Sequence, residues 1–351
     1  MSTSAWMVAT GARTPLGLDS QASAAAVRAA ISAVTKHPFM VDQEGDAVSN
    51  AMDSLFASEL TGPARMLALA LGALQELSAA LATVAGGRLA LPVYLALPER
   101  RPGFTQEDAQ AVHAGLLAAG GMSFDISQVF SLPQGHAAGL AALHKASENI
   151  RSGALDTCIV GGVDTYLHAD TIEWLDANRQ LAGTVSRGGF VPGEGAGFCL
   201  LMSDAACRRS GLGASVRVAA AATGREIKLI KTEDVCLGLG LTQVVRDALI
   251  APSGGALRVD NIICDINAER YRGEEWGFVC LRLSQHFTDP TAYLSPADCW
   301  GDMGAASGPL FAMLACQAAA RGYAAGPRTL LWASSEGGLR SAVLLEATVA
   351  A

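Results

Sequence analysis

Apolar positions along this chain repeat with two different periods, and the two kinds of segment alternate from one end to the other. Short runs of apolar and β-branched residues are typical of buried strands, whereas apolar residues three and four positions apart are typical of helices. The predicted strands are residues 5–12, 126–132, 156–164, 189–202, 215–223, 261–268, 328–335 and 341–349. The predicted helices are residues 20–34, 105–121, 239–251 and 301–320, and a further helix that begins at His136.

The most apolar stretch, residues 66–97, is predicted to be a buried helix, a glycine turn and a strand. It contains Gln75, Glu76, Arg88 and the pair Gly86–Gly87. A helix that crosses a membrane needs about 20 consecutive apolar residues, and these residues interrupt the run. We therefore expect no membrane span. The first residues of the chain also lack the cationic and apolar regions of a secretory signal peptide.

The alternation of strands and helices predicts an α/β protein. Successive βαβ units favour mostly parallel sheets with helices packed on their faces. The pattern occurs twice, and the two βαβ-rich halves join near residues 206–213. We therefore divide the chain into an N-terminal half, residues 1–206, and a C-terminal half, residues 207–351.

Composition and charge exclude several classes of protein. The chain has 351 residues, of which 50% are hydrophobic and 17% charged, so it can bury one large core or two fused ones and is not disordered. Its net charge is −8, and its Lys and Arg residues are dispersed. Because nucleic-acid binding needs a basic patch or stripe, no nucleic-acid partner is expected.

The cysteines indicate a reducing compartment. No two of them form a C-x-x-C motif, and most lie within apolar segments, which suits reduced core thiols better than disulfides or a zinc site. They are Cys158, Cys199, Cys207, Cys236, Cys264, Cys280, Cys299 and Cys316. We therefore expect a cytoplasmic protein without a metal.

Four glycine-containing stretches occur in an informative order. They are VATGARTPLG at 8–17, HAAGLAALHKASENIRSGALDTCIVGGVDTY at 136–166, GGFVPGEGAGFCLL at 188–201 and SSEGGLRSAVLL at 334–345. Each glycine patch alone is more often an ordinary tight turn. Together, and with the combination of F-x-x-G-E-G-A-G and an upstream G-G-x-D, they resemble the β-ketoacyl synthases of the thiolase-fold condensing enzymes. The resemblance covers nearly the whole chain and implies a thiolase-like fold, with two similar halves packed as a layered α/β structure.

The resemblance also implies a site, but its catalytic residues are replaced. In the family, a cysteine thiolate at a helix start takes the acyl group, and two histidines bind the carbonyl oxygen on which negative charge develops. Here the cysteine position falls on His136, the first histidine on Glu269 and the second on Asp302. An aromatic residue of the family gates the acyl tunnel near the Gly-Gly hairpin, and Glu336 stands in that region.

The substituted set opposes the family's chemistry. A carboxylate about 4 Å from a developing enolate repels it by roughly 4 kcal/mol at an effective dielectric constant near 20, which is about a thousandfold in rate. A charged residue where an acyl chain should pass is also unfavourable. We therefore predict no condensing activity and no cofactor, and we assign no catalytic residue. His136, Glu269, Asp302 and Glu336 are instead predicted to form a polar network in a vestigial site.

Ordinary structural roles remain open for these residues. A buried histidine is more often bonded to backbone or a carboxylate than catalytic, and Glu269 and Asp302 can neutralise it or face water. The segment ERYRGEEW, residues 269–276, is interpreted as a solvated loop with internal ion pairs, or as a partner contact through its Arg, Tyr and Trp residues. The other five histidines show no ligand spacing.

Two classes of function are compatible with this sequence. The first is a catalytically inactive synthase homologue that binds a protein, either a homologous thiolase-like partner, as a chain-length factor does, or a secreted effector, as do the degenerate thiolase-like proteins that accompany type VI secretion effectors. The second is an enzyme, which processes thioesters or uses His136, Glu269 and Asp302 in altered acid–base or metal chemistry. A homodimer or heterodimer is expected, because the family pairs the strand before the nucleophile helix across a two-fold axis, and FDISQVFSL suits such pairing.

Overall fold

A computed structural model describes residues 3–348 except 83–87, 185, 230, 231, 233 and 251–256. Within these residues, most strands join one ten-stranded sheet, in the order β10-β9-β11-β12-β8-β1-β7-β6-β4-β5. The N-terminal half supplies β1 (Ala5–Arg13), β4 (Ala90–Leu97), β5 (Asp125–Pro133), β6 (Thr157–Thr165) and β7 (Glu194–Ser203). The C-terminal half supplies β8 (Val216–Arg225), β9 (Asn261–Cys264), β10 (Tyr293–Leu294), β11 (Arg328–Ser334) and β12 (Leu339–Ala347).

The two halves repeat one topology. In the first, β5, β4 and β6 are parallel neighbours, and β7 and β1 follow antiparallel. In the second, β10, β9 and β11 are parallel, and β12 and β8 follow antiparallel. The halves meet where Trp6 pairs with Arg217 and Met7 with Val216. The prediction of two similar halves is therefore confirmed, and the predicted boundary at residue 206 lies within the connecting helix α6 (Asp204–Ser210).

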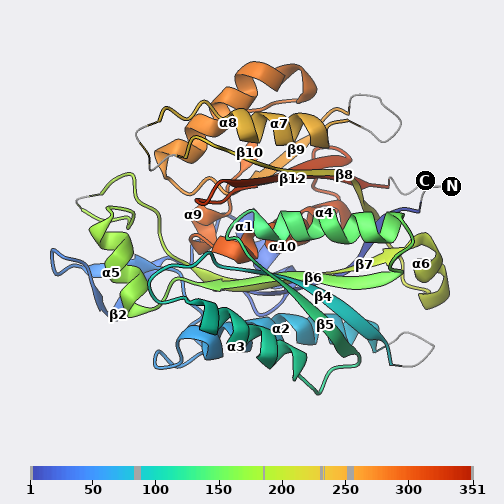
Figure 1. Ribbon diagram of the computed structural model, residues 1–351, viewed down its shortest axis with the longest axis horizontal. Helices are drawn as coiled ribbons and strands as arrows, with labels where there is room; N and C mark the ends of the chain where they lie inside the picture. The colour runs from blue at the N-terminus through green and yellow to red at the C-terminus, as the bar shows by residue number, and fades with distance from the viewer. Residues whose placement is uncertain are drawn as a thin grey trace.

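The strands of the two halves form two layers, and helices lie between these layers and on both outer sides, so the fold has five layers (Figure 1). The central layer contains α1 (Ser20–Arg28), α4 (Ala138–Arg151) and α10 (Ser307–Ala320), and both α4 and α10 contact strands of the two halves. One outer layer holds α2 (Gly62–Leu81) and α3 (Gln106–Leu117), and the other holds α7 (Leu239–Ala248) and α8 (Arg270–Leu283). Because α4 is covered on two sides, its small and apolar residues are almost all buried.

Helix α2 is long and apolar enough to cross a membrane by composition alone, but it packs on the sheet. Leu69, Leu74 and Leu77 are fully buried in the core between α2 and the strands of the N-terminal half. An ion pair between Arg65 of α2 and Glu194 of β7, with a 2.6 Å contact, fixes the helix to the glycine-rich strand. The predicted helix and strand of residues 66–97 are present, and the predicted glycine turn lies outside the described residues.

Three local predictions were wrong. The sheet is mixed rather than mostly parallel, because β6–β7, β7–β1 and their counterparts pair antiparallel. The helix predicted for residues 20–34 ends at Arg28, because Ala30 has a positive φ of 55°. Residues 270–283, expected to begin as a solvated loop, form the helix α8. A hairpin of β2 (Thr35–Val41) and β3 (Ala47–Asn50), and helices α5 (Ala169–Ala177) and α9 (Ala297–Trp300), were not predicted.

Candidate functional site

His136 lies in a tight turn between β5 and α4. Gly135 has a φ of +70°, and a Cβ there would come 3.1 Å from the Glu99 side chain, so this position favours glycine. The Ser335 hydroxyl donates to the carbonyl of Gln134 and accepts from the amide of Ala137 at 2.9 Å, which anchors the turn to the C-terminal half. The backbone therefore holds the His136 side chain in the interior, where it is 6% exposed.

Asp302 is the direct partner of His136. The imidazole Nε2 lies 2.8 Å from Oδ1 and 3.0 Å from Oδ2 of this carboxylate. Asp302 also accepts from the Gly304 amide at 2.7 Å, from the Tyr166 hydroxyl at 3.2 Å and from the Asn267 side-chain amide. Gly304 has a positive φ of 46°, and a Cβ there would collide with Asp164. The position whose amide donates to Asp302 therefore also requires glycine. The carboxylate is fully satisfied by donors.

The pKa shifts of both members favour the charged form of the pair. Burial lowers the pKa of His136, and the Arg272 charge lowers it further, but the charge and hydrogen bond of Asp302, together with the charge of Asp265, make the net direction upward. Burial raises the pKa of Asp302, but the imidazolium, its hydrogen bond and the Arg272 guanidinium together bring that pKa well below its usual range. This geometry is the ion pair that the polar-network prediction requires, with the two groups well within 6 Å.

Arg272, which the sequence interpretation placed in a solvated loop, is fully buried at the centre of the site. Its guanidinium forms an ion pair with Asp265, donates to the Ser334 carbonyl at 2.8 Å and lies 3.3 Å from Nε2 of His136. Burial lowers the pKa of Arg272, but the surrounding carboxylates, Asp265 first, raise it well above its ordinary value. The alternative interpretation, a partner contact, therefore does not hold for Tyr271, Arg272 and Trp276, which are buried, whereas Arg270 is exposed.

A sequence signal for this burial existed. Apolar residues at Trp276, Val279 and Leu283 are three and four positions apart and mark the buried face of α8. The charged residues between them obscured the pattern, although only Arg270 and Glu274 form the exposed i, i+4 pair that a solvated segment would contain.

Glu269 belongs to the network but does not contact His136. Its carboxylate lies 3.3 Å from the Arg272 guanidinium and accepts from Asn267 at 3.3 Å and from Gln180 at 3.1 Å. Among the residues that the structure describes, it shares no hydrogen bond with His136. Arg272 therefore separates the two groups that the sequence placed in one trio.

Glu336 is connected to the same network through Gln180. The Gln180 amide donates to Glu336 at 2.9 Å as well as to Glu269, and so bridges the turn after β11 to the start of α8. Gln180 is buried and lies between α5 and β7, in a segment that carried no predicted site residue. No sequence signal distinguished it from its polar neighbours.

A pocket of about 280 Å³ opens beside His136. Its walls combine charged groups, among them Glu99, Arg101 and Glu336, with the rings of Tyr166, Trp174 and Phe190. Arg101 is held by a 2.6 Å ion pair to Asp164 and by the Tyr166 ring, 4.1 Å away. Burial raises the pKa of Glu99, which the neighbouring His136 charge partly offsets. The described lining contains no cysteine, and charged groups interrupt its apolar wall.

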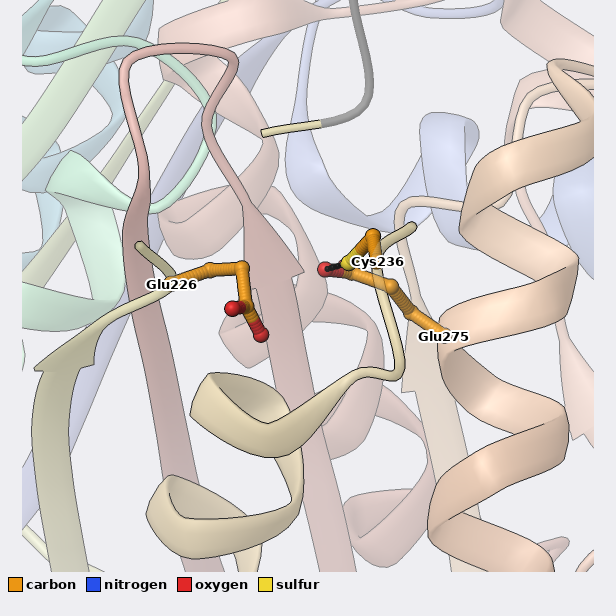
Figure 2. Close-up of side chains that lie close together, drawn as sticks. All are labelled: Glu226, Cys236 and Glu275. Carbon is orange, nitrogen blue, oxygen red and sulfur yellow. Dashed lines mark hydrogen bonds between the residues drawn. The ribbon is translucent and has the colours of Figure 1, made fainter. Parts of the chain in front are cut away.

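Two clusters of charged side chains lie near the sheet, and neither cluster fits the needs of a metal site or a reactive thiolate. Arg272 lies among His136, Glu269 and Asp302, and its positive charge would repel a metal ion. Among the described residues, the group whose ligand atoms lie closest to one another is Glu226, Cys236 and Glu275, all within 4.8 Å (Figure 2). Glu275 is already paired with Arg340 at 2.6 Å, and burial raises the pKa of Cys236 to about 11. Glu275 is therefore occupied by an ion pair, and Glu226 accepts from backbone amides, among them that of Gly240 at 2.7 Å.

Known proteins share this fold at low sequence identity. The family model of the beta-ketoacyl synthase N-terminal domain matches residues 131–206, and no curated protein sequence matches the chain. A type II polyketide ketosynthase solved with its acyl-carrier protein has a TM-score of 0.77 and 17% identity over 99% of this chain and 100% of its own. A ketosynthase from module 6 of the bacillaene synthase of Bacillus subtilis 168 has a TM-score of 0.77 and 13% sequence identity. The match covers 99% of this chain and 72% of that one.

A third similar structure is a ketosynthase in complex with its chain length factor from Xenorhabdus doucetiae. Its TM-score is 0.73 at 14% identity, over 99% of this chain and 98% of that one. At these identities the likeness shows the fold and leaves the activity open. The chain therefore has the thiolase-like ketosynthase fold that the four sequence stretches predicted.

Proposed function

We propose that this chain is a catalytically inactive ketosynthase-fold protein that acts in the cytoplasm by binding another polypeptide. One observation carries the proposal: at the start of α4, where the resemblance places the acyl-accepting thiol, stands the His136–Asp302 ion pair with Arg272 beside it. The donors that would stabilise a developing oxyanion, such as the Gly304 amide and Asn267, are already bound to Asp302. An enolate formed there would meet a carboxylate instead of free donors.

The edge strand β5 supports a protein partner of the same fold. It is nine residues long and pairs on one side with β4, so its other side carries backbone groups that a further strand can satisfy. Phe130 on this strand is 38% exposed and stacks on Tyr94 at 5.0 Å, which adds apolar surface to the edge. A homologous chain, like the chain length factor of the similar complexes, is one partner compatible with this edge. A type VI secretion effector is the other partner proposed.

Intact-mass spectrometry after incubation with acyl and malonyl thioesters tests the absence of condensing chemistry. We expect no acyl adduct and no release of carbon dioxide, because no described pocket residue supplies a thiolate. A stoichiometric adduct on His136 that is lost in His136→Ala would overturn the proposal. Affinity purification from the native cell identifies the partner, and neighbouring genes separate a synthase setting from a secretion setting.

A second candidate function is acid–base catalysis by His136. The ring forms part of the pocket wall while Asp302 holds its Nε2 nitrogen, which is the arrangement of an oriented general acid or base. Thioester hydrolysis that follows the ionisation of His136 and disappears in His136→Gln would support this function over the binding role.

A further inference from the structure

Three hollows in the protein surface meet along α5. The pocket beside His136 and a second hollow of about 720 Å³ share Trp174 in their walls. The second hollow shares Asp42 and Asp176 with a third, of about 240 Å³. We call the second and third hollows, which extend from Trp174 past Asp42, the α5 groove.

The walls of the α5 groove come from segments far apart in the sequence. Helix α5 and the segment that follows it, which includes Arg179 and Ala182, form one wall, and the turn of the β2–β3 hairpin forms the other. Helix α5 and the hairpin lie side by side at one end of the molecule (Figure 1). The Gln43 amide donates to the Asp176 carboxylate at 2.7 Å and fixes the hairpin against the helix. The groove is thus a feature of the tertiary structure and not of one loop.

Negative charge dominates the α5 groove. Five carboxylates line it, and none forms an ion pair with any residue that the structure describes: Asp42, Glu44, Asp170, Glu173 and Asp176. Arg179 is the one cation in the described lining. The hairpin adds exposed apolar side chains, since Phe39 is 73% and Val41 59% exposed.

The spacing of these charges does not suit a single metal ion. In the part of the chain that is described, the five carboxylates include no group of three whose ligand atoms lie within 4.8 Å of one another. Carboxylates spread along a groove instead match a row of separate cations, and the exposed Val41 in the lining matches an apolar side chain of the same segment. Lys and Arg residues on an extended polypeptide supply both features.

We propose that the α5 groove binds an extended, basic segment of a partner protein. This inference rests on the proposed protein-binding function and names the chemistry of one surface that performs it. The groove is separate from the β5 edge, so one partner can pair with the edge while a basic segment occupies the groove.

Fluorescence anisotropy with a labelled (Arg-Ala-Ser)4 peptide tests the inference, with a (Glu-Ala-Ser)4 peptide as the probe control. We expect the full chain to bind the basic peptide at low salt, with affinity at least about tenfold weaker at 300 mM than at 50 mM salt because the charges are exposed. The double variant Glu44→Lys/Glu173→Lys should weaken binding at least about tenfold. The matched variant Glu148→Lys/Asp247→Lys, which reverses exposed charges on α4 and α7, should change it less than about twofold.

Equal binding of the two peptides, no binding of the basic peptide, or equal affinities of the two double variants would overturn the inference. Circular dichroism and melting of both variants check that they are folded. Purification of the chain with its cellular partner distinguishes the two proposals. If a cellular partner copurifies but the basic peptide does not bind, only the inference about the α5 groove is contradicted. If no partner copurifies and the peptide does not bind, the protein-binding function is contradicted as well.

Discussion

The two halves of the molecule share their strand order and strand directions but end in different edges. The N-terminal half ends in β5, which has nine residues, and its counterpart β10 has two. Their exposed aromatic residues are similar, since Phe130 is 38% and Tyr293 40% exposed. A repeated topology therefore builds the same scaffold twice, while the last strands differ in length, and we expect only the longer edge to pair with another chain.

The halves also contribute differently to the site between them. The N-terminal half supplies His136, Tyr166 and Gln180, and the C-terminal half supplies Arg272, Asp302 and the other acidic members. Separating the halves would leave buried charges of both signs without partners, which is strongly unfavourable. The network thus joins the two halves, and the following variants measure that role.

The largest expected effect is that of Arg272→Met. Removing the guanidinium leaves Asp265 and Glu269 buried without their cation, and we expect the free energy of unfolding to fall by about 3–5 kcal/mol. Urea denaturation measures this change in the free energy of unfolding. Arg270→Met on the same helix is the control, because its partner Glu274 is exposed and its loss should cost less than about 1 kcal/mol. Equal effects of the two variants would show that Arg272 does not stabilise the network.

His136→Ala should destabilise the protein by about 2–4 kcal/mol. The change removes the cation that Asp302 binds directly, but Arg272 and the Gly304 and Asn267 donors remain. Thermal melting and urea denaturation measure the loss. His144→Ala, which removes a less buried histidine paired with Glu148, should cost less than about 1 kcal/mol. An unchanged melting temperature for His136→Ala would contradict the ion pair.

The next largest expected effect is that of a charge on an edge strand, which should weaken association when it lies on β5 and not when it lies on β10. Phe130→Lys places a charge on β5, and we expect it to weaken self-association or partner association at least about tenfold. Tyr293→Lys is matched in exposure but lies on the short β10, and it should leave association unchanged. Light scattering across a concentration series, with sedimentation for the partner complex, gives the masses. A wild-type chain that is monomeric and partner-free at micromolar concentration would contradict pairing through β5.

The smallest expected effect is a pH dependence of the ion pair. The folded pKa of His136 is raised above 6.5, so its stabilisation is fully present below pH 6.5 and is lost as the pH rises through the folded value. The folded pKa of Asp302 is lowered from 3.8, so its contribution is lost only as the pH falls through that lower value. The difference in unfolding free energy between wild type and His136→Asn should therefore shrink from pH 6 to pH 9. A difference that grows over this interval would contradict the assignment.

Much of the fold could be predicted from the sequence, because hydrophobic periodicity and glycine turns are local properties. Strands such as β1, β6 and β12 and helices such as α3 and α7 lie close to their predicted ranges. The antiparallel pairing of β6 with β7 could not be predicted, because strand direction in a sheet depends on how the connecting chain returns.

The sequence by itself determined the order of the glycine-containing motifs, and the resemblance that they carry predicts that His136, Glu269 and Asp302 occupy the positions of a ketosynthase site. Only the tertiary structure decided that Asp302 pairs with His136 and that Glu269 does not, because Arg272 enters from α8 between them. A buried arginine is stable only where several partners converge on it. Here Asp265, Glu269 and the Ser334 carbonyl come from segments up to 69 positions apart, and no local pattern records that convergence.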